Sequence, residues 1–226
     1  MQYPVRHRFN NKRPQNTLLM KRISAIIPVL LSVVLFSASC EESKMTDDHE
    51  NWQERNSDYI DKIASSTFIT DIQNAAPEQM FRLLSFKLDP KGSSSWGNGM
   101  YVYCKVISKG TGTVTPQYTD SVRVNYRVRL IPTDNYPEGQ VIDQSFKTEK
   151  LDPSVNVPSS FCISGLIDGV ATALMNMRCG DFWQLYIPYG LGYGTTDRTN
   201  IPGYSALIYE INLTEIARTG QDLSPR

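Results

Sequence analysis

The sequence is poor in histidine. Its two histidines are His7 and His49, and the long remainder of the chain has none. Hydrolases that use a Ser-His-Asp or Cys-His arrangement need a base beside their nucleophile. The sequence therefore argues against hydrolase chemistry of that kind in the C-terminal part.

Motifs for metals and nucleotides are also missing. No group of His, Cys and Asp has metal-ligand spacing, and no glycine loop precedes a Lys-Ser/Thr pair. Gly110-Thr111-Gly112 lacks the rest of a nucleotide fingerprint, and a tight turn explains it. We expect no metal and no cofactor.

The chain has no acidic residue before Cys40, although its formal net charge is zero. Without the six basic residues of that stretch, the remainder has 17 basic and 23 acidic side chains, a net charge of −6. Binding of nucleic acid needs clustered Lys and Arg, so we expect no nucleic-acid partner.

The apolar run from Ile23 to Phe36 is shorter than the roughly 20 residues that span a membrane. Lys21-Arg22 precede it and small residues follow it, as in a secretory signal. Ser37-Ala38-Ser39-Cys40 is similar to a loose bacterial lipobox, which implies lipid attachment at Cys40 and a membrane partner. An ordinary signal peptide or an uncleaved anchor is the alternative, and Met20 is an alternative start.

The next part of the chain is expected to be a tether and a helical arm. Residues 41–48 are acidic and apolar-poor, a composition that cannot bury a core. Trp52, Tyr59, Ile60 and Ile63 have the spacing of one helical face, and a second short helix is expected over Pro77–Leu84. The arm is either a docking or dimerisation element or a helix that packs on its own domain.

The C-terminal half alternates short strands with turns. We expect strands over residues 100–107, 121–131, 140–145, 160–163, 182–187 and 206–213. Gly169 and Gly180 bracket a segment with helical spacing, and Gly180 occupies a position that favours a left-handed residue. Trp183, Leu185 and Ile187 fall on one face of a strand that ends before Pro188 because proline donates no hydrogen bond.

This half resembles the FKBP-type peptidyl-prolyl cis-trans isomerases, from about Met100 to Ala217. The likeness lies in the order of several motifs, each of which is weak when taken alone. The matching runs are Val124-Asn125-Tyr126, Ile142-Asp143, Leu166-Ile167-Asp168-Gly169-Val170, Met177-Arg178-Cys179-Gly180, Ile187-Pro188 and Leu191-Gly192-Tyr193-Gly194.

The resemblance implies an α+β fold, with a curved antiparallel sheet of about five strands wrapped around one short helix. The expected organisation is a signal peptide over residues 1–39, Cys40 with tether and arm over 40–97, the isomerase domain over 98–218 and a tail over 219–226. A homodimer through the arm is a weaker implication of the same resemblance.

The resemblance also assigns a proline pocket. Asp143 matches the carboxylate at its border, and Tyr193 matches a tyrosine whose hydroxyl bonds a substrate carbonyl; both are the candidate catalytic residues. The candidate substrate-binding residues are Tyr126, Ile142, Leu166, Ile167, Val170, Ile201 and Tyr209.

Three positions depart from the family pattern. Ile142 and Ser159 stand where the family has aromatic residues, and Val170 replaces the tryptophan of the pocket floor. Burial of a large apolar side chain contributes ~1.5–3 kcal/mol. We therefore expect a wider, shallower pocket, weaker macrolide binding and lower activity than in a typical member.

Two functions remain open. The leading prediction is a lipid-anchored isomerase that acts on proline-containing polypeptides at the outer membrane of a Gram-negative bacterium, facing the periplasm or the cell surface. The alternative is a chaperone or binding module that kept the fold and lost most turnover.

Three cysteines remain after Cys40: Cys104, Cys162 and Cys179. An odd number leaves at least one free thiol, and we expect no disulfide.

Overall fold

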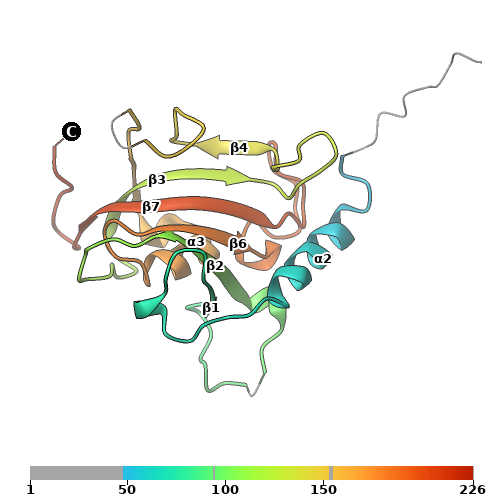
Figure 1. Cartoon of the computed structure of the whole chain (residues 1–226), viewed down its shortest axis with the longest axis horizontal. Helices are drawn as coiled ribbons and strands as arrows, with labels where there is room; N and C mark the ends of the chain where they lie inside the picture. The colour runs from blue at the N-terminus through green and yellow to red at the C-terminus, as the bar shows by residue number, and fades with distance from the viewer. Residues whose placement is uncertain (1–47, 94, 153–154, 226) are drawn as a thin grey trace, which may run out of the picture. The chain divides into compact units, whose positions relative to one another are not determined.

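The structure is a computed structural model that describes residues 48–93, 95–152 and 155–225 (Figure 1). The predicted signal peptide, Cys40 and most of the acidic tether lie outside these residues. The region from Asp47 to Arg226 forms one compact unit. No helix in the described ranges is long and apolar enough to cross a membrane.

A seven-stranded antiparallel sheet organises this unit, with the strand order β1-β2-β6-β7-β3-β4 and with β5 paired to β3. β4 pairs with residues 127–129 of β3, whereas β5 pairs with residues 121–124 of the same strand. The α+β class is confirmed, but the expected number of about five strands was too low. The strands are β1 (Met80–Leu84), β2 (Tyr101–Ser108), β3 (Ser121–Arg129), β4 (Val141–Gln144), β5 (Ser159–Cys162), β6 (Phe182–Ile187) and β7 (Leu207–Ala217).

β1 accounts for part of that difference. The prediction of a helix over Pro77–Leu84 was wrong, because Met80–Leu84 pairs with β2 along its whole length. Phe81 and Leu83 are buried while Arg82 between them is exposed. That alternation is typical of a strand, but a short apolar run does not distinguish strand from helix until a pairing partner is available.

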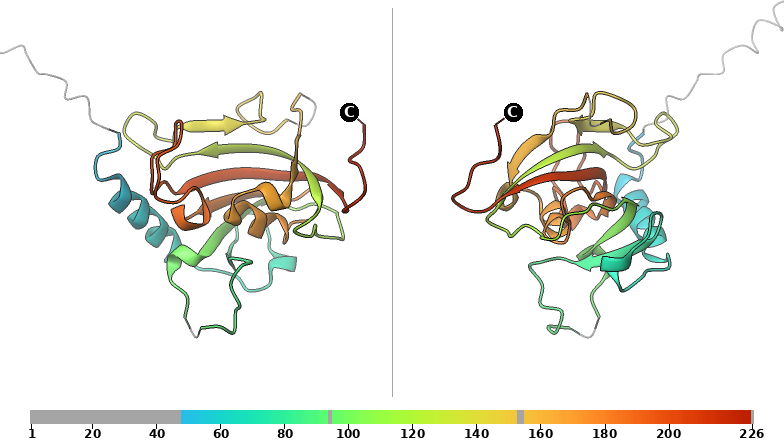
Figure 2. Two further views of the ribbon diagram at one scale, coloured as in Figure 1. Left: turned by 180° about the vertical axis from the view of Figure 1, so that it is seen from behind. Right: turned by 60° about the vertical axis from the view of Figure 1, so that its left-hand side comes forward.

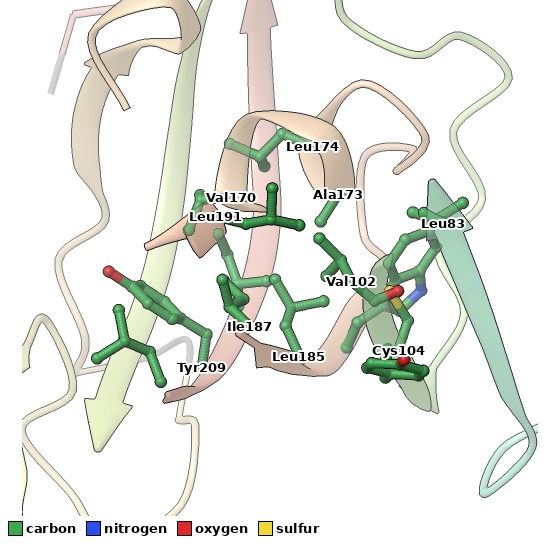
Figure 3. Close-up of a cluster of buried hydrophobic side chains, with 14 of the residues drawn as sticks. Leu83, Val102, Cys104, Val170, Ala173, Leu174, Leu185, Ile187, Leu191 and Tyr209 are labelled. Carbon is green, nitrogen blue, oxygen red and sulfur yellow. The ribbon is translucent and has the colours of Figure 1, made fainter. Parts of the chain in front are cut away.

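The helix α3 (Asp168–Leu174) lies across one face of the sheet, and the main core fills the space between them (Figure 3). All of its residues after Asp168 are buried. Gly180 follows the helix with a φ of +92°, as the left-handed position required. Short 3₁₀ turns lie at η1 (Ile72–Asn74), η2 (Asn98–Met100), η3 (Ile163–Gly165) and η4 (Tyr189–Leu191).

The helix α2 (Trp52–Ala64) belongs to the same compact unit and packs near the opposite face of the sheet (Figure 1). The ring of Tyr59 lies 6.2 Å from that of Tyr186 on β6. The Trp52 indole donates a 2.9 Å hydrogen bond to the hydroxyl of Ser205, and Trp52 and Ile60 are buried. The structure therefore supports the second interpretation of the arm, a helix that packs on its own domain.

Candidate functional site

An open cavity of about 180 Å³ lies between the N-terminal end of α3 and the strands β3 and β7. Both strands present side chains to it with a period of two: Val124 and Tyr126 come from β3, and Tyr209 and Ile211 come from β7. The segment that enters α3 closes the cavity from the other side. Its lining residues are Val124, Tyr126, Asp143, Phe161, Gly165, Leu166, Ile167, Val170, Tyr193, Tyr209 and Ile211.

Tyr126 and Asp143 form a polar rim at this cavity. The Tyr126 hydroxyl donates a 2.7 Å hydrogen bond to the carboxylate of Asp143. Burial raises the pKa of Tyr126, and the bond to the Asp143 carboxylate raises it further. The Asp143 carboxylate also accepts a 2.8 Å bond from the backbone N–H of Gln144. The rim therefore keeps a protonated phenol and a carboxylate that is held in place from two sides.

Tyr209 and Tyr193 form a second polar pair at the cavity. Burial raises the pKa of Tyr209, and the charge and hydrogen bond of Tyr193 add to this effect. The guanidinium of Arg198 lies 5.2 Å from the centre of the Tyr193 ring. Because Tyr209 stays protonated well beyond neutral pH, its hydroxyl adds no charge to the apolar wall.

The structure brings together most of the predicted site residues, but not Ile142 and Ile201. Both pack against the core without lining the cavity. β4 has a bulge where it pairs with Val128 and Arg129, so strict alternation does not apply at Ile142, which packs against the core and is not among the cavity-lining residues. Ile201 is held instead in a small hairpin, where it exchanges two backbone hydrogen bonds with Arg198.

Phe161 supplies a wall that the sequence interpretation missed. Its ring meets that of Tyr126 edge to face at 5.7 Å. The departure from the family pattern at Ser159 stays a prediction, and Phe161 supplies a ring elsewhere in the same strand. Ser159 and Phe161 are two residues apart on β5 and share a face, so strand alternation alone was the signal that could have found the ring.

Comparisons with known proteins match the same part of the chain. Residues 112–214 match the family model described as FKBP-type peptidyl-prolyl cis-trans isomerase. The chain is 36% identical over 113 residues to the FKBP-type 22 kDa peptidyl-prolyl cis-trans isomerase of Escherichia coli, covering 50% of this chain and 48% of that protein. It is 31% identical over 146 residues to the isomerase Mip of Coxiella burnetii, covering 64% and 56%. The chain thus spans about half the length of these curated relatives.

Solved structures support the fold. A peptidyl-prolyl cis-trans isomerase from Pseudomonas syringae superposes with a TM-score of 0.51 at 21% identity, covering 75% of this chain and 96% of that one. FkpA from Escherichia coli gives a TM-score of 0.51 at 21% identity, covering 92% and 84%. At this identity the likeness concerns the arrangement of the chain only.

Proposed function

We propose, since this chain contains an FKBP-type peptidyl-prolyl cis-trans isomerase domain, that it isomerises X–Pro bonds in proline-containing polypeptides. The observation that carries the proposal is the convergence of Tyr126, Asp143, Ile167, Tyr193 and Tyr209 on one open cavity. These residues come from five separate parts of the chain, so their convergence is a property of the fold.

The chemistry fits an apolar cavity because no bond is broken. Rotation about a peptide bond faces a barrier of about 18–20 kcal/mol. A twisted amide loses resonance, so its carbonyl oxygen carries less charge in the transition state than in the ground state. A site that excludes water therefore penalises the planar amide more than the twisted one, which is selective stabilisation of the transition state.

Each residue has a place in this proposal. Ile167, Val170 and Tyr209 would hold the proline ring between α3 and β7. Tyr193 would donate its hydroxyl to a substrate carbonyl. Asp143, held by Tyr126 at 2.7 Å, would border the ring as a fixed carboxylate beside the rotating amide.

The test is an isomerisation assay on a proline-containing peptide. Tyr193→Phe and Asp143→Ala should each lower kcat/KM by about three- to tenfold, the effect of one lost hydrogen bond. Tyr136→Phe is the matched control, because Tyr136 is exposed and does not line the cavity. Turnover equal to wild type in both site variants would remove their proposed roles.

A second candidate function is a chaperone or binding module with little turnover. Val170 favours it, because a buried valine stands where the family has a tryptophan that floors the pocket, and Ile142 supplies no wall. Phe161 counts against it by restoring ring surface. Isomerisation near background, together with retained suppression of aggregation of an unfolded protein, would decide for this alternative.

For location, we propose a lipid anchor at Cys40 in the envelope of a Gram-negative bacterium. One relative that is 31% identical over 115 residues is named outer membrane protein MIP of Legionella longbeachae. Cys40→Ala should release the protein from membranes, and unchanged membrane association would refute an anchor at this residue.

A homodimer through the arm would use the exposed face of α2, because Trp52 and Ile60 are buried in their own domain. Light scattering would test whether the protein is a dimer.

A further inference from the structure

A larger groove, of about 670 Å³, lies beside β1 and is separate from the isomerase cavity. One wall is formed by β1 and β2, and a second by the segment after α2. The loop that joins β1 to β2 and projects from the sheet edge supplies the rest (Figure 2). Its walls include Phe68, Ile72, Arg82, Leu84, Trp96 and Tyr101.

Strand register places this groove on the sheet face opposite α3. Phe81 pairs with Cys104, which pairs with Leu185, and these side chains face α3. Arg82 and Leu84 alternate with Phe81 and therefore point to the other face. The groove and the isomerase cavity lie on opposite faces of one sheet, so one can be changed without changing the other.

Arg82 gives the groove a positive charge that no described residue neutralises. Its guanidinium lies 4.5 Å from the centre of the Tyr101 ring and 5.8 Å from that of Phe68. No carboxylate among the described residues is within ion-pair distance of it. Stacking between aromatic rings leaves the N–H groups at the edge of a guanidinium available to an acceptor.

Trp96, a residue of the groove wall, has a buried donor without an acceptor. Its indole N–H is shielded from solvent and has no hydrogen-bond partner among the described residues. An N–H that is buried in this way carries a free-energy cost that an acceptor relieves. The groove thus combines aromatic and aliphatic walls with an uncompensated positive charge, and the indole N–H of Trp96 lies buried within its wall.

We propose that this groove binds an extended polypeptide segment that carries a carboxylate between apolar residues. Its volume is within the range of about 300–1,000 Å³ that is usual for ligand sites. A carboxylate is the acceptor that best matches a guanidinium edge, and the apolar neighbours would contact Phe68, Leu84 and Tyr101. The proposal goes beyond the isomerase activity, since it assigns the protein a second polypeptide site.

The test uses two labelled peptides without proline, so that the isomerase cavity is not addressed. One peptide has an aspartate between leucine and phenylalanine residues, and the other has asparagine at that position. The full chain, solubilised in detergent, is titrated with each peptide, and anisotropy is followed together with the indole N–H resonance of Trp96. The aspartate peptide should bind about tenfold more tightly and shift the Trp96 resonance.

Variants separate the groove from its surroundings. Arg82→Met keeps the apolar stem and removes the charge, and it should abolish the preference for aspartate. Trp96→Phe identifies the resonance and should weaken binding of both peptides. Lys62→Met is the control, because Lys62 is exposed on α2 and does not line the groove. Isomerisation of a proline peptide should be unchanged in all three variants, so a failure of the proposed isomerase activity would show separately.

Three outcomes would overturn the proposal. The first is equal affinity for the aspartate and asparagine peptides. The second is binding that survives Arg82→Met unchanged. The third is a Trp96 resonance that shifts with protein concentration in the absence of peptide, together with a change in molecular mass, because a second copy of this chain would then be the occupant.

Discussion

The contact between Gly169 and Ile187 fixes how closely α3 approaches the sheet. A Cβ atom at position 169 would lie 2.4 Å from a methyl group of Ile187, which is fully buried on β6. Glycine is therefore required here for close packing of the helix on the strand. This packing also positions the next residue, Val170, at the cavity.

Gly169→Ala should therefore destabilise the fold by about 1–3 kcal/mol, the usual cost of overpacking. Urea unfolding is the measurement. Gly190→Ala is the control, because no atom lies within 4 Å of a Cβ at that position. Equal stability of the two variants would mean that α3 can shift away from the sheet without cost.

Arg127 fixes the segment that carries Asp143. The side chain is buried on β3, and its Nε donates a 2.8 Å bond to the amide oxygen of Gln144. Its two terminal nitrogens donate to the backbone carbonyls of Thr148 and Glu149 at 2.6 and 2.5 Å. One planar group thus holds both ends of the chain that follows Asp143.

Arg127→Lys should lower stability by about 1–3 kcal/mol, because an ammonium cannot reproduce three bonds in a fork. Isomerase kcat/KM should fall as the rim loosens. Thermal unfolding and the peptide assay measure the two effects. Arg129→Lys changes only a partly exposed pair with Glu210 at 3.3 Å and keeps its charge, so it should change both much less. The reverse order would contradict the role of Arg127.

Among the elements, α2 shows how a predicted helix becomes part of the domain. Asn56 is on the buried face of α2, and its side-chain oxygen accepts a 2.8 Å bond from the backbone N–H of Ala206. Its amide group donates a 2.7 Å bond to the carbonyl of Trp52. A polar residue thus joins the arm to the start of β7.

Asn56→Ala leaves the Ala206 N–H buried without an acceptor, which costs about 1–3 kcal/mol. The melting temperature should fall, and proteolysis near residues 48–64 should become faster. Ser57→Ala is the neighbouring control, since its hydroxyl is exposed and bonds only its own helix at Gln53. Faster cleavage in both variants would argue against a specific dock at Asn56.

Elements differed in how far their sequence predicted them. β6 was found at its observed bounds, Phe182–Ile187, because alternation and a following proline are both local signals. β1 was missed, because its pairing with β2 depends on a partner some 20 residues away in the chain. The loop between β1 and β2 contributes Trp96 to the groove, and no local sequence pattern predicts that groove.

For the whole molecule, the order of motifs predicted the fold class and most of the cavity. It could not predict which neighbours of each motif turn inward. Phe161, to which no role was assigned, lines the cavity and Ile142 does not, because both positions depend on how β5 and the bulged strand β4 pair with β3. Arg82 became a candidate binding residue only after β1 was placed at the sheet edge.

Burial of Tyr59 on α2 and of Tyr103 on β2 also gives the whole molecule a pH dependence. Burial raises the pKa of Tyr59 to about 12, with a further contribution from Tyr186, and burial raises that of Tyr103 to about 12. In the unfolded chain both groups titrate near 10.0. The unfolded state therefore loses these protons first as pH rises.

The two tyrosines thus contribute stability that is fully present below about pH 10 and is lost between about pH 10 and pH 12. Urea unfolding followed by circular dichroism over this interval should give a free energy of unfolding that decreases with pH. Tyr59→Phe should make the decrease shallower, because phenylalanine has no proton to lose. Since lysines titrate in the same interval, the difference between wild type and Tyr59→Phe carries the argument. Parallel curves for the two proteins would show that Tyr59 titrates alike in both states and is not held by α2 against Tyr186.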